Sequence, residues 1–242
     1  MKGRIVVEFD VLDSTNDYAK EVAKEARDGT VIQARRQRKG KGRRDRIWYS
    51  EEGGLYLSVI LKPEREVKKL LPLTLLTSLA VVETLRDYKI EPKIKWPNDV
   101  LVNGKKIAGV LVETACAGER LEYVVVGVGI NVNNDLKECP EGVSVKDIKK
   151  EEVVLRELRE RFLNHFFLFY SEFLEKGFGK MKKRWVEEAQ AEGKRLKDRK
   201  TGKIFGIFLD IAEDGGIIYK PIEKDVSSLP ELTYDTEIDF LK

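Results

Sequence analysis

The chain has few of the side chains that most often build metal centres and covalent active sites. Its 242 residues include two cysteines, one histidine and two methionines. Cys116 and Cys139 are too few for a disulfide framework or a cysteine-rich metal cluster. With His165 as the single histidine, an all-histidine metal site is excluded, and a Ser-His-Asp triad is disfavoured because only one candidate base exists.

Long hydrophobic runs and a large net charge are also absent. No uninterrupted apolar stretch approaches the roughly 18–20 residues that cross a bilayer. The N-terminus, MKGRIVVEFD, reaches an acidic residue too early for a secretory signal. The 45 basic and 42 acidic residues leave a net charge of +3, which gives no global field for nucleic acid, although a local patch stays open. We therefore expect a cytoplasmic protein with no membrane partner.

What is present is the composition of a globular protein, with 42% hydrophobic and 36% charged residues. The length suits one large domain, or a medium domain with a small appendix. After Gly193 the helical spacing gives way to short strands with glycine turns. We therefore predict a domain boundary there, with one domain over residues 1–191 and a small β domain over residues 192–242.

Hydrophobic periodicity predicts an α+β fold. Strands are expected over residues 4–9, 30–34, 55–61, 100–102, 105–113, 122–127, 195–197, 204–211 and 216–221, and helices over 14–29, 70–88, 153–174 and 178–191. Asn103-Gly104 between two strands is a strong hairpin signal. The arrangement predicts a mixed, largely antiparallel sheet flanked by helices. The polar tail after Ser228 is expected to be loosely held.

The first segment whose residues could bind a ligand or take part in catalysis is the basic loop at residues 37–48, QRKGKGRRDRIW. Gly40 and Gly42 allow its backbone to approach a ligand closely, so the loop can offer N–H groups and cations to phosphate oxygens. A solvated, flexible loop and a nucleic-acid contact are the alternatives, and the P-loop spacing is absent. Against the single acid Asp45 the loop sets six cations, namely Arg38, Lys39, Lys41, Arg43, Arg44 and Arg46.

The second segment is KWPND at residues 95–99, which is followed by Lys106 and Gly109. Asn98 and Asp99 can orient groups through hydrogen bonds or hold a metal through oxygen. Lys106 belongs to an otherwise apolar strand, where a lysine either points outward or meets a buried anion. The pattern fits an anion site, or simply a turn followed by an edge lysine.

The third segment is GVGINVN at residues 127–133. Gly127 and Gly129 alternate along a strand, so they remove side chains from one of its faces. Their spacing leaves room for a flat ligand or another backbone, or else marks a bulge at the end of the strand. No dinucleotide-binding fingerprint follows the G-x-G.

Taken with Ser14-Thr15-Asn16 and the strand KKIAGVLVE, these segments resemble, in this order, the catalytic domain of the biotin protein ligase family. The resemblance covers roughly residues 8–134. It implies the α+β fold of class II aminoacyl-tRNA synthetases and biotin/lipoate ligases, together with a small C-terminal SH3-like β domain. On this interpretation residues 1–191 are the catalytic domain and residues 192–242 the barrel-like one.

The resemblance also implies a two-step reaction that uses ATP, biotin and Mg²⁺. The biotin carboxylate attacks the α-phosphate of ATP and gives biotinyl-5′-AMP and pyrophosphate. A lysine of an acceptor domain, such as the biotin carboxyl-carrier protein of acetyl-CoA carboxylase, then attacks the adenylate. No enzyme nucleophile is required, which agrees with the single histidine. By analogy we expect a homodimer.

Position by position, the resemblance implies the site residues. Lys106 and Arg43 would stabilise charge as two anions react, and Asp99 would assist the acceptor lysine or orient Mg²⁺. The basic loop should close over the adenylate and exclude water. The residues expected at biotin are Ser14, Thr15, Asn16, Gln37, Gly40, Lys41, Gly42, Arg43, Lys106, Gly109, Gly127 and Gly129. Those expected at ATP or the adenylate are Arg43, Arg44, Arg46, Trp48, Lys95, Asn98, Asp99, Lys106 and Asn131.

Some positions depart from the family pattern, and two other functions stay open. Asp45 stands where the family usually has glycine, and residues 225–228 match its closing strand only in part. The first strand begins near Arg4, which leaves no room for the DNA-binding module of repressor-type members, so we expect no DNA binding. The alternatives are a lipoate or octanoate ligase or transferase of the same fold, and a nucleic-acid-binding module that uses residues 35–46.

Overall fold

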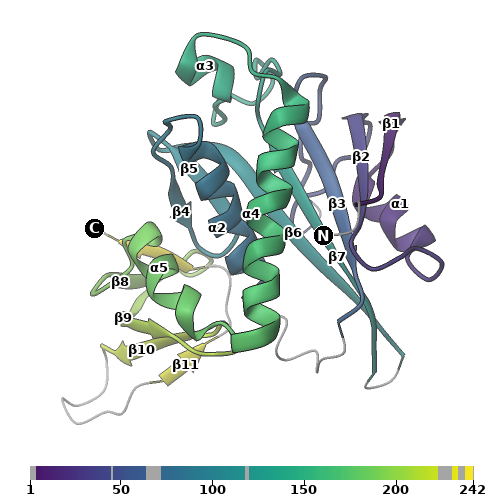
Figure 1. The fold of residues 1–242 in the computed structure, drawn as a ribbon. Coiled ribbons are helices and arrows are strands. Elements are labelled where there is room, and N and C mark those ends of the chain that lie inside the picture. The colour runs from purple at the N-terminus through teal and green to yellow at the C-terminus, as the bar shows by residue number, and fades with distance from the viewer. Residues whose placement is uncertain are drawn as a thin grey trace.

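The computed structural model describes residues 4–44, 46–63, 72–117, 120–222, 231–233 and 238–241; Asp45 and residues 225–228, discussed above, lie outside these ranges. Within them the chain forms two sheets and five helices (Figure 1). The helices are α1 (Thr15–Val22), α2 (Pro72–Arg86), α3 (Val145–Lys149), α4 (Leu155–Lys176) and α5 (Gly179–Ala189).

The larger sheet has seven strands in the order β1-β2-β3-β7-β6-β5-β4. β1 and β2 are parallel, and every other neighbouring pair is antiparallel, which confirms the predicted mixed, largely antiparallel sheet. Asn103 and Gly104 join β5 to β6 with φ values of 51° and 78°, the left-handed backbone of a two-residue hairpin. The strands are β1 (Val6–Leu12), β2 (Thr30–Gln37), β3 (Leu55–Leu61), β4 (Lys93–Lys95), β5 (Asp99–Val102), β6 (Lys105–Ala117) and β7 (Arg120–Ile130).

The two faces of this sheet pack against different helices, because alternate side chains of a strand point to opposite sides. Val59 and Val126 belong to the main core, which includes the buried side chains of α2 and α4. Their neighbours Ile60 and Val125 belong to a smaller cluster beneath α1. Figure 1 shows α4 lying across the front of the sheet. The α1 face therefore lies on the opposite side, where the helix leaves part of the sheet uncovered.

The smaller sheet has five strands in the order β11-β10-β9-β8-β12. The expectation of a loosely held tail is wrong for its two last strands, because β11 pairs with β10 and β12 pairs with β8. The predicted domain boundary falls between α5 and β8, and the division into two domains stays a prediction. The strands are β8 (Arg195–Asp198), β9 (Ile204–Ile211), β10 (Ile217–Pro221), β11 (Glu231–Thr233) and β12 (Ile238–Leu241).

Aromatic side chains join the two sheets. Trp96 packs edge-on against Trp185 of α5, with 5.6 Å between the ring centroids, and 6.4 Å from Phe240 of β12. The buried Trp185 donates its indole N–H to Ser78 of α2 at 3.2 Å. The KWPND segment is thus held from the side of the smaller sheet as well. Among the described residues, no helix has both the length and the apolar character needed to cross a membrane.

Candidate active site

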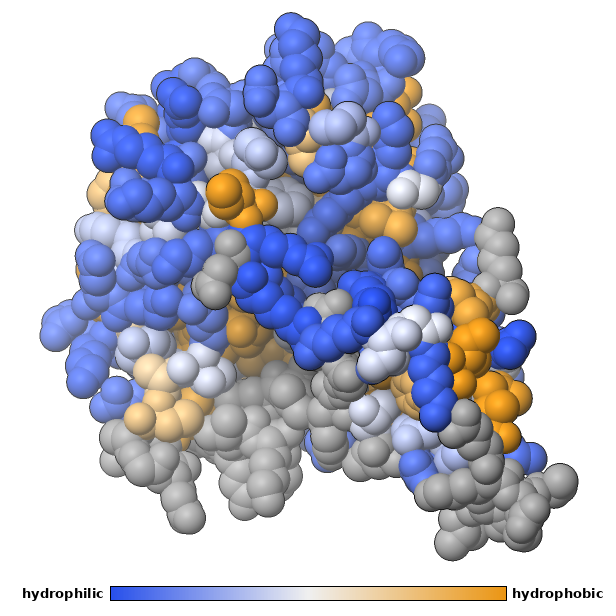
Figure 2. Space-filling model, turned by 180° about the vertical axis from the view of Figure 1, so that it is seen from behind, coloured by the Kyte–Doolittle hydropathy of each residue, from blue (hydrophilic) through white to orange (hydrophobic). Residues whose placement is uncertain are grey.

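A cavity of about 390 Å³ lies on the α1 face of the large sheet. β6 and β7 form its floor, the N-terminus of α1 forms one wall, and the basic loop between β2 and β3 covers it. Figure 2 shows the molecule from this side, opposite to α4: hydrophilic residues dominate, and apolar surface is visible in the recesses between them.

The basic loop folds into a narrow hairpin. The Gly42 amide donates to the Arg46 carbonyl at 2.7 Å, and the Trp48 amide donates to the Gly40 carbonyl at 2.8 Å. Two side chains attach the loop to other elements. Lys41 forms an ion pair with Asp17 of α1 at 2.7 Å, and Arg43 donates to Asn98 Oδ1 of the KWPND segment at 3.3 Å. The loop therefore lies closed over the cavity.

Two contacts hold the pKa of Asp17 below its usual value. Partial burial by itself would raise this pKa, but hydrogen bonds from Lys41 and Lys20 outweigh the effect of burial. The carboxylate that anchors the loop to α1 is therefore charged at neutral pH.

The two alternating glycines of β7 admit side chains of the chain itself. A Cβ atom placed on Gly127 would lie 2.2 Å from Asn16 Oδ1, and one on Gly129 would lie 2.4 Å from Trp48 Nε1. Gly109, the cross-strand neighbour of Gly129, faces the same indole at 3.1 Å. Above Gly129 and Gly109, where the sequence predicted room for a flat ligand or another backbone, lies an indole of the chain itself. The two glycines of β7 thus make room for different side chains, Gly127 for Asn16 and Gly129 for Trp48.

A hydrogen-bonded chain of buried polar groups forms the α1 end of the cavity. Asn16 Nδ2 donates to Glu113 Oε2 at 2.7 Å and to the Leu111 carbonyl at 3.3 Å. Ser58 Oγ donates to Asn16 Oδ1 at 2.6 Å. Glu113 also accepts from Lys20 at 2.8 Å. Both ends of the Asn16 amide are thus engaged by the protein.

From Ser58 the chain continues toward the loop. Ser58 Oγ lies 2.8 Å from Thr15 Oγ1, and Gln37 Oε1 accepts from the Thr15 amide at 2.7 Å. Gln37 Nε2 donates to Ser50 Oγ, which donates to the Trp48 carbonyl at 2.9 Å. We call this set, from Glu113 to Trp48, the network end of the cavity.

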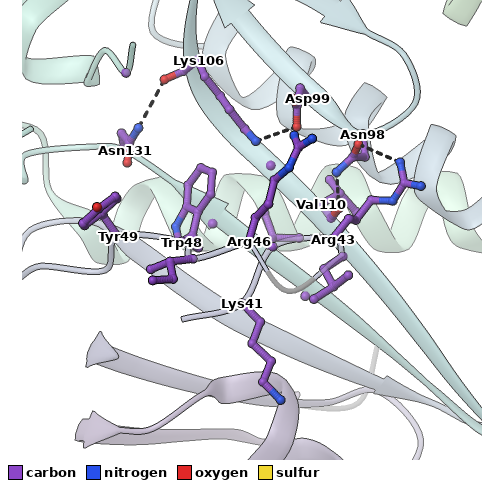
Figure 3. Close-up of a pocket in the computed structure, with 18 of the residues that line it drawn as sticks. Lys41, Arg43, Arg46, Trp48, Tyr49, Asn98, Asp99, Lys106, Val110 and Asn131 are labelled. Carbon is purple, nitrogen blue, oxygen red and sulfur yellow. Dashed lines mark hydrogen bonds and ion pairs between the residues drawn. The ribbon is translucent and has the colours of Figure 1, made fainter. Parts of the chain in front are cut away.

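The other end of the cavity, here the charged end, gathers cations. Lys106 Nζ lies 2.7 Å from Asp99 Oδ1 and 5.1 Å from the centre of the Trp48 ring. Figure 3 shows Lys106, Asp99 and Arg46 converging on one region, while Lys41 points away from them. Asn131 donates to the Lys106 carbonyl at 3.3 Å.

The structure brings nearly all predicted site residues to this one cavity. Gly40 is the exception: it lies behind the lining, where a Cβ atom would be 2.3 Å from the Trp48 carbonyl oxygen. The roles assigned to individual residues stay predictions. Those that line the cavity are Ser14, Thr15, Asn16, Gln37, Lys41, Gly42, Arg43, Arg44, Arg46, Trp48, Lys95, Asn98, Asp99, Lys106, Gly109, Gly127, Gly129 and Asn131.

Several lining or supporting residues were not expected from the sequence. Ser58 is completely buried within the apolar strand β3, and Glu113 belongs to β6; a polar residue in such a run is a usable signal. Arg199 reaches the cavity from the smaller sheet, where it bonds to Asp239 at 2.7 Å, and no local pattern predicts this. Cys139 also lines the cavity. Burial, and then the Glu141 carboxylate, raise the pKa of its thiol.

Outside the cavity, the basic segment is matched by carboxylates. Its exposed cations therefore form an ion-paired surface, which weakens the prediction of a nucleic-acid contact at residues 35–46. The pairs are Arg35 with Glu52, Arg36 with Glu51, and Arg38 and Lys39 with Asp13.

Comparison with known proteins decides the family. The model of the biotin/lipoate A/B protein ligase family matches residues 8–131, just over half of the chain. The chain belongs to this family. The sequence resemblance is thereby confirmed, and the matched residues span the strands, the loop and the helix that build the cavity.

Individual relatives lie on the biotin branch of the family. The bifunctional ligase/repressor BirA of Bacillus subtilis is 34% identical over 91% of this chain and 71% of its own length. The biotin–[acetyl-CoA-carboxylase] ligase of Paracoccus denitrificans is 29% identical over 86% of this chain and 91% of its own length. Biotin protein ligase from Aquifex aeolicus, solved in complex with biotin and ATP, superposes with a TM-score of 0.80 at 30% identity, covering 98% of this chain and 99% of that one.

Proposed function

We propose that this protein is an ATP-dependent biotin protein ligase. It activates biotin as biotinyl-5′-AMP and transfers the biotinyl group to a lysine of an acceptor domain, such as that of acetyl-CoA carboxylase. The observation that carries the proposal is one cavity with two unlike ends, joined by a glycine floor: a hydrogen-bonding network that lines the cavity with the neutral side chains Thr15, Asn16 and Gln37, and a cluster of cations. Biotin has the matching polarity, with a neutral ureido ring at one end and a carboxylate at the other.

In the first step the biotin carboxylate oxygen attacks the α-phosphorus of ATP, and the bond to the leaving pyrophosphate breaks. Both reactants are anions, so fixed positive charge must lie where they meet. Lys106, oriented by Asp99 at 2.7 Å, and Arg43, oriented by Asn98, supply it. Since these cations are positioned before the ligand arrives, little reorganisation is needed in the transition state.

In the second step the acceptor lysine amine attacks the acyl carbon, AMP leaves, and the amine proton passes to solvent. The adenylate hydrolyses in water, so the site must stay closed until the acceptor arrives. The basic loop, attached by Lys41 to α1 and by Arg43 to Asn98, meets that need. Asp99 binds Lys106 and in this reading orients it, rather than serving as a metal ligand.

We propose that Mg²⁺ enters as the counter-ion of ATP. Within the described residues no three of the side chains that bind metals gather at one place. Asp99, the candidate ligand, already forms an ion pair with Lys106. The described part of the chain thus offers no ready-made magnesium cage, and the phosphate oxygens of ATP would hold the ion.

The protein is further proposed to act in the cytoplasm as a homodimer. β1 is an edge strand of the large sheet, and its exposed residues include Val7 and Val11, at 37% and 41%. An edge strand presents unpaired backbone N–H and C=O groups, to which a strand of another chain can pair. Light scattering on a size-exclusion column would report the mass, and a value near 28 kDa at micromolar concentration would reject the dimer.

Intact-mass spectrometry tests the proposed function. A biotin-acceptor domain is incubated with the protein, Mg-ATP and biotin, and a parallel tube contains lipoate in place of biotin. A biotinyl mass gain that requires ATP is expected in the first tube only. A lipoyl gain without a biotinyl gain would move the chain to the lipoate branch. Failure in both tubes, together with no biotin-dependent release of pyrophosphate, would overturn the proposal.

A further inference from the structure

We infer that Asp17 is a positioning residue that holds the basic loop closed through Lys41, and that Lys20, which shares the same carboxylate, weakens that hold. This inference rests on the proposed function, because it concerns how long the closed loop keeps biotinyl-5′-AMP in the cavity. Neither Asp17 nor Lys20 lines the cavity. Both can therefore change the retention of the adenylate without touching it.

The contact between the loop and α1 joins one lysine to both oxygens of one carboxylate. Lys41 Nζ lies 2.8 Å from Asp17 Oδ1 and 2.7 Å from Asp17 Oδ2. Figure 3 shows Lys41 extended away from the charged end of the cavity. The backbone of Lys41 pairs across the narrow hairpin with Ile47, which directly precedes Trp48. A movement of Lys41 is thus passed to the arm of the loop that carries the indole.

Asp17 is held in place by its own helix, independently of the loop. It belongs to the first turn of α1, where its amide donates to the side chain of the N-cap residue Ser14 at 3.3 Å. A carboxylate in the first turn is also favoured by the dipole of the helix. Asp17 is therefore the fixed member of the pair, and Lys41 is the member that moves with the loop.

A second lysine competes for the same carboxylate. Lys20, one turn further along α1, lies 3.0 Å from Asp17 Oδ1, the oxygen that also accepts from Lys41. Two ammonium groups that share one oxygen atom repel each other. Glu113 of β6 binds Lys20 at 2.8 Å. Burial alone would lower the pKa of Lys20, but its hydrogen bonds to Glu113 and Asp17 raise this pKa, so the competing lysine is charged at neutral pH.

Substitutions of the two α1 residues should therefore act with opposite signs. Loss of the Lys20 charge removes both a competitor and a like charge, so Lys41 should bind Asp17 more tightly and the loop should stay closed longer. Loss of the Asp17 charge leaves two lysines facing each other, so the loop should open more readily. General damage to α1 would instead loosen the loop in both cases.

The test measures the rate at which biotinyl-5′-AMP leaves the protein after it has formed in the cavity. We expect release to be about threefold faster for Asp17→Asn and about twofold slower for Lys20→Met, which is the scale of one partly exposed ion pair. Formation of the adenylate is followed by single-turnover release of pyrophosphate at saturating biotin and ATP. It should stay within about twofold in both variants, because neither residue lines the cavity.

The matched control is Asp13→Asn. Asp13 also pairs with two cations of the basic segment, Arg38 at 3.5 Å and Lys39 at 2.9 Å. These pairs lie at the base of the loop, where the Lys39 amide already donates to the Asp13 carbonyl at 2.8 Å. The backbone there is fixed without the ion pairs, so release from Asp13→Asn should stay within about 1.5-fold of wild type.

Two further measurements separate the ion pair from simple structural damage. In a Lys41→Met background, Lys20→Met should no longer slow release and Asp17→Asn should no longer accelerate it, because the shared partner is gone. At about 1 M KCl, where charges are screened beyond roughly 3 Å, the release rates of wild type and Asp17→Asn should converge. Should Asp17→Asn fail to fold, Lys20→Met, which changes a partly exposed side chain, carries the same comparison.

The outcomes separate the two proposals. Wild-type protein that releases no pyrophosphate when biotin and ATP are added contradicts the proposed function itself. Wild-type protein that forms the adenylate, while Asp17→Asn releases it at the wild-type rate, overturns the role of Asp17. Unchanged or faster release from Lys20→Met overturns the opposing role of Lys20, and so does slower release that persists in the Lys41→Met background.

Discussion

The two ends of the cavity differ in the side chains that form them and in the kind of ligand group that each can bind. At the network end, hydrogen bonds link the Glu113 carboxylate to neutral groups, several of them buried, as Asn16 shows with both ends of its amide engaged. At the charged end, Lys106 is about one-third exposed, and the buried indole nitrogen of Trp48 has no partner among the described groups. The first end is complete before a ligand arrives. The charged end presents a partly exposed cation and the indole N–H of Trp48, which can bind a group on which negative charge develops.

The largest effect is expected at the charged end. Lys106→Ala should slow biotin-dependent pyrophosphate release by at least about 100-fold, because it removes a fixed cation from the reacting groups. Thermal unfolding should stay near the wild-type value, since Lys106 is not a core residue. The matched control is the exposed neighbour Lys105→Ala, which should keep its rate. An unchanged rate in Lys106→Ala would remove this residue from the chemistry.

Substitutions at the two glycines of β7 compare the rigidity of the two ends, because Gly127 faces the network end and Gly129 faces Trp48. Gly127→Ala places a methyl group 2.2 Å from the held Asn16 amide, and Gly129→Ala places one 2.4 Å from Trp48 on the loop. We expect Gly127→Ala to lower the free energy of unfolding by about 1–3 kcal/mol, as overpacking does. Gly129→Ala should lower it less, because the loop can yield, and should weaken ATP binding instead. Equal losses of stability would mean that the loop is as rigid as the network.

Arg43→Gly should release the adenylate faster. This variant removes the bond to Asn98 that holds the loop, and with it a charge beside the phosphate. A charge-assisted hydrogen bond is worth about 1.5–3 kcal/mol, so at least a tenfold faster release of biotinyl-5′-AMP is expected. Arg38→Gly, which removes an exposed guanidinium paired with Asp13, is the control. Equal release from both variants would argue against the closing role of Arg43.

The smallest effect is a difference in alkylation between the two cysteines. The pKa of Cys139 is raised by burial and by Glu141, so less of it is thiolate at pH 8 and it should react with iodoacetamide more slowly than the exposed Cys116. Its rate should rise with pH toward the shifted pKa. Biotin with ATP should protect Cys139 alone, because it lines the cavity. Peptide mass spectrometry measures the alkylation rate of each cysteine. If biotin with ATP changed the rates of Cys139 and Cys116 equally, the ligand would not bind beside Cys139.

Residue type and spacing predicted most of the site, because its chemistry is concentrated in short segments. β3 was predicted with its observed ends, and the Asn103-Gly104 hairpin follows from local backbone preference. The supporting partners were harder to predict. Ser58 contacts Asn16 across 42 residues, and Arg199 contacts Trp96 across 103. Such pairs depend on the tertiary arrangement, which one sequence does not display.

The misses in the fold have the same cause. α1 was expected to reach Gly29 but ends at Val22, and α3 and β4 are too short for periodicity to reveal. β12 has four residues, and its pairing with β8 comes from a partner about 40 residues away. Short elements are stabilised by their neighbours rather than by their own pattern.

The glycine floor sets a limit for inhibitor design. A pocket is commonly enlarged by trimming the side chains beneath the ligand, but Gly109, Gly127 and Gly129 have none to trim. Extra volume above Gly109 and Gly129 can come from moving the Trp48 indole, which packs against both. Compounds that displace or replace that ring would therefore gain space, whereas compounds that push into the sheet would meet backbone.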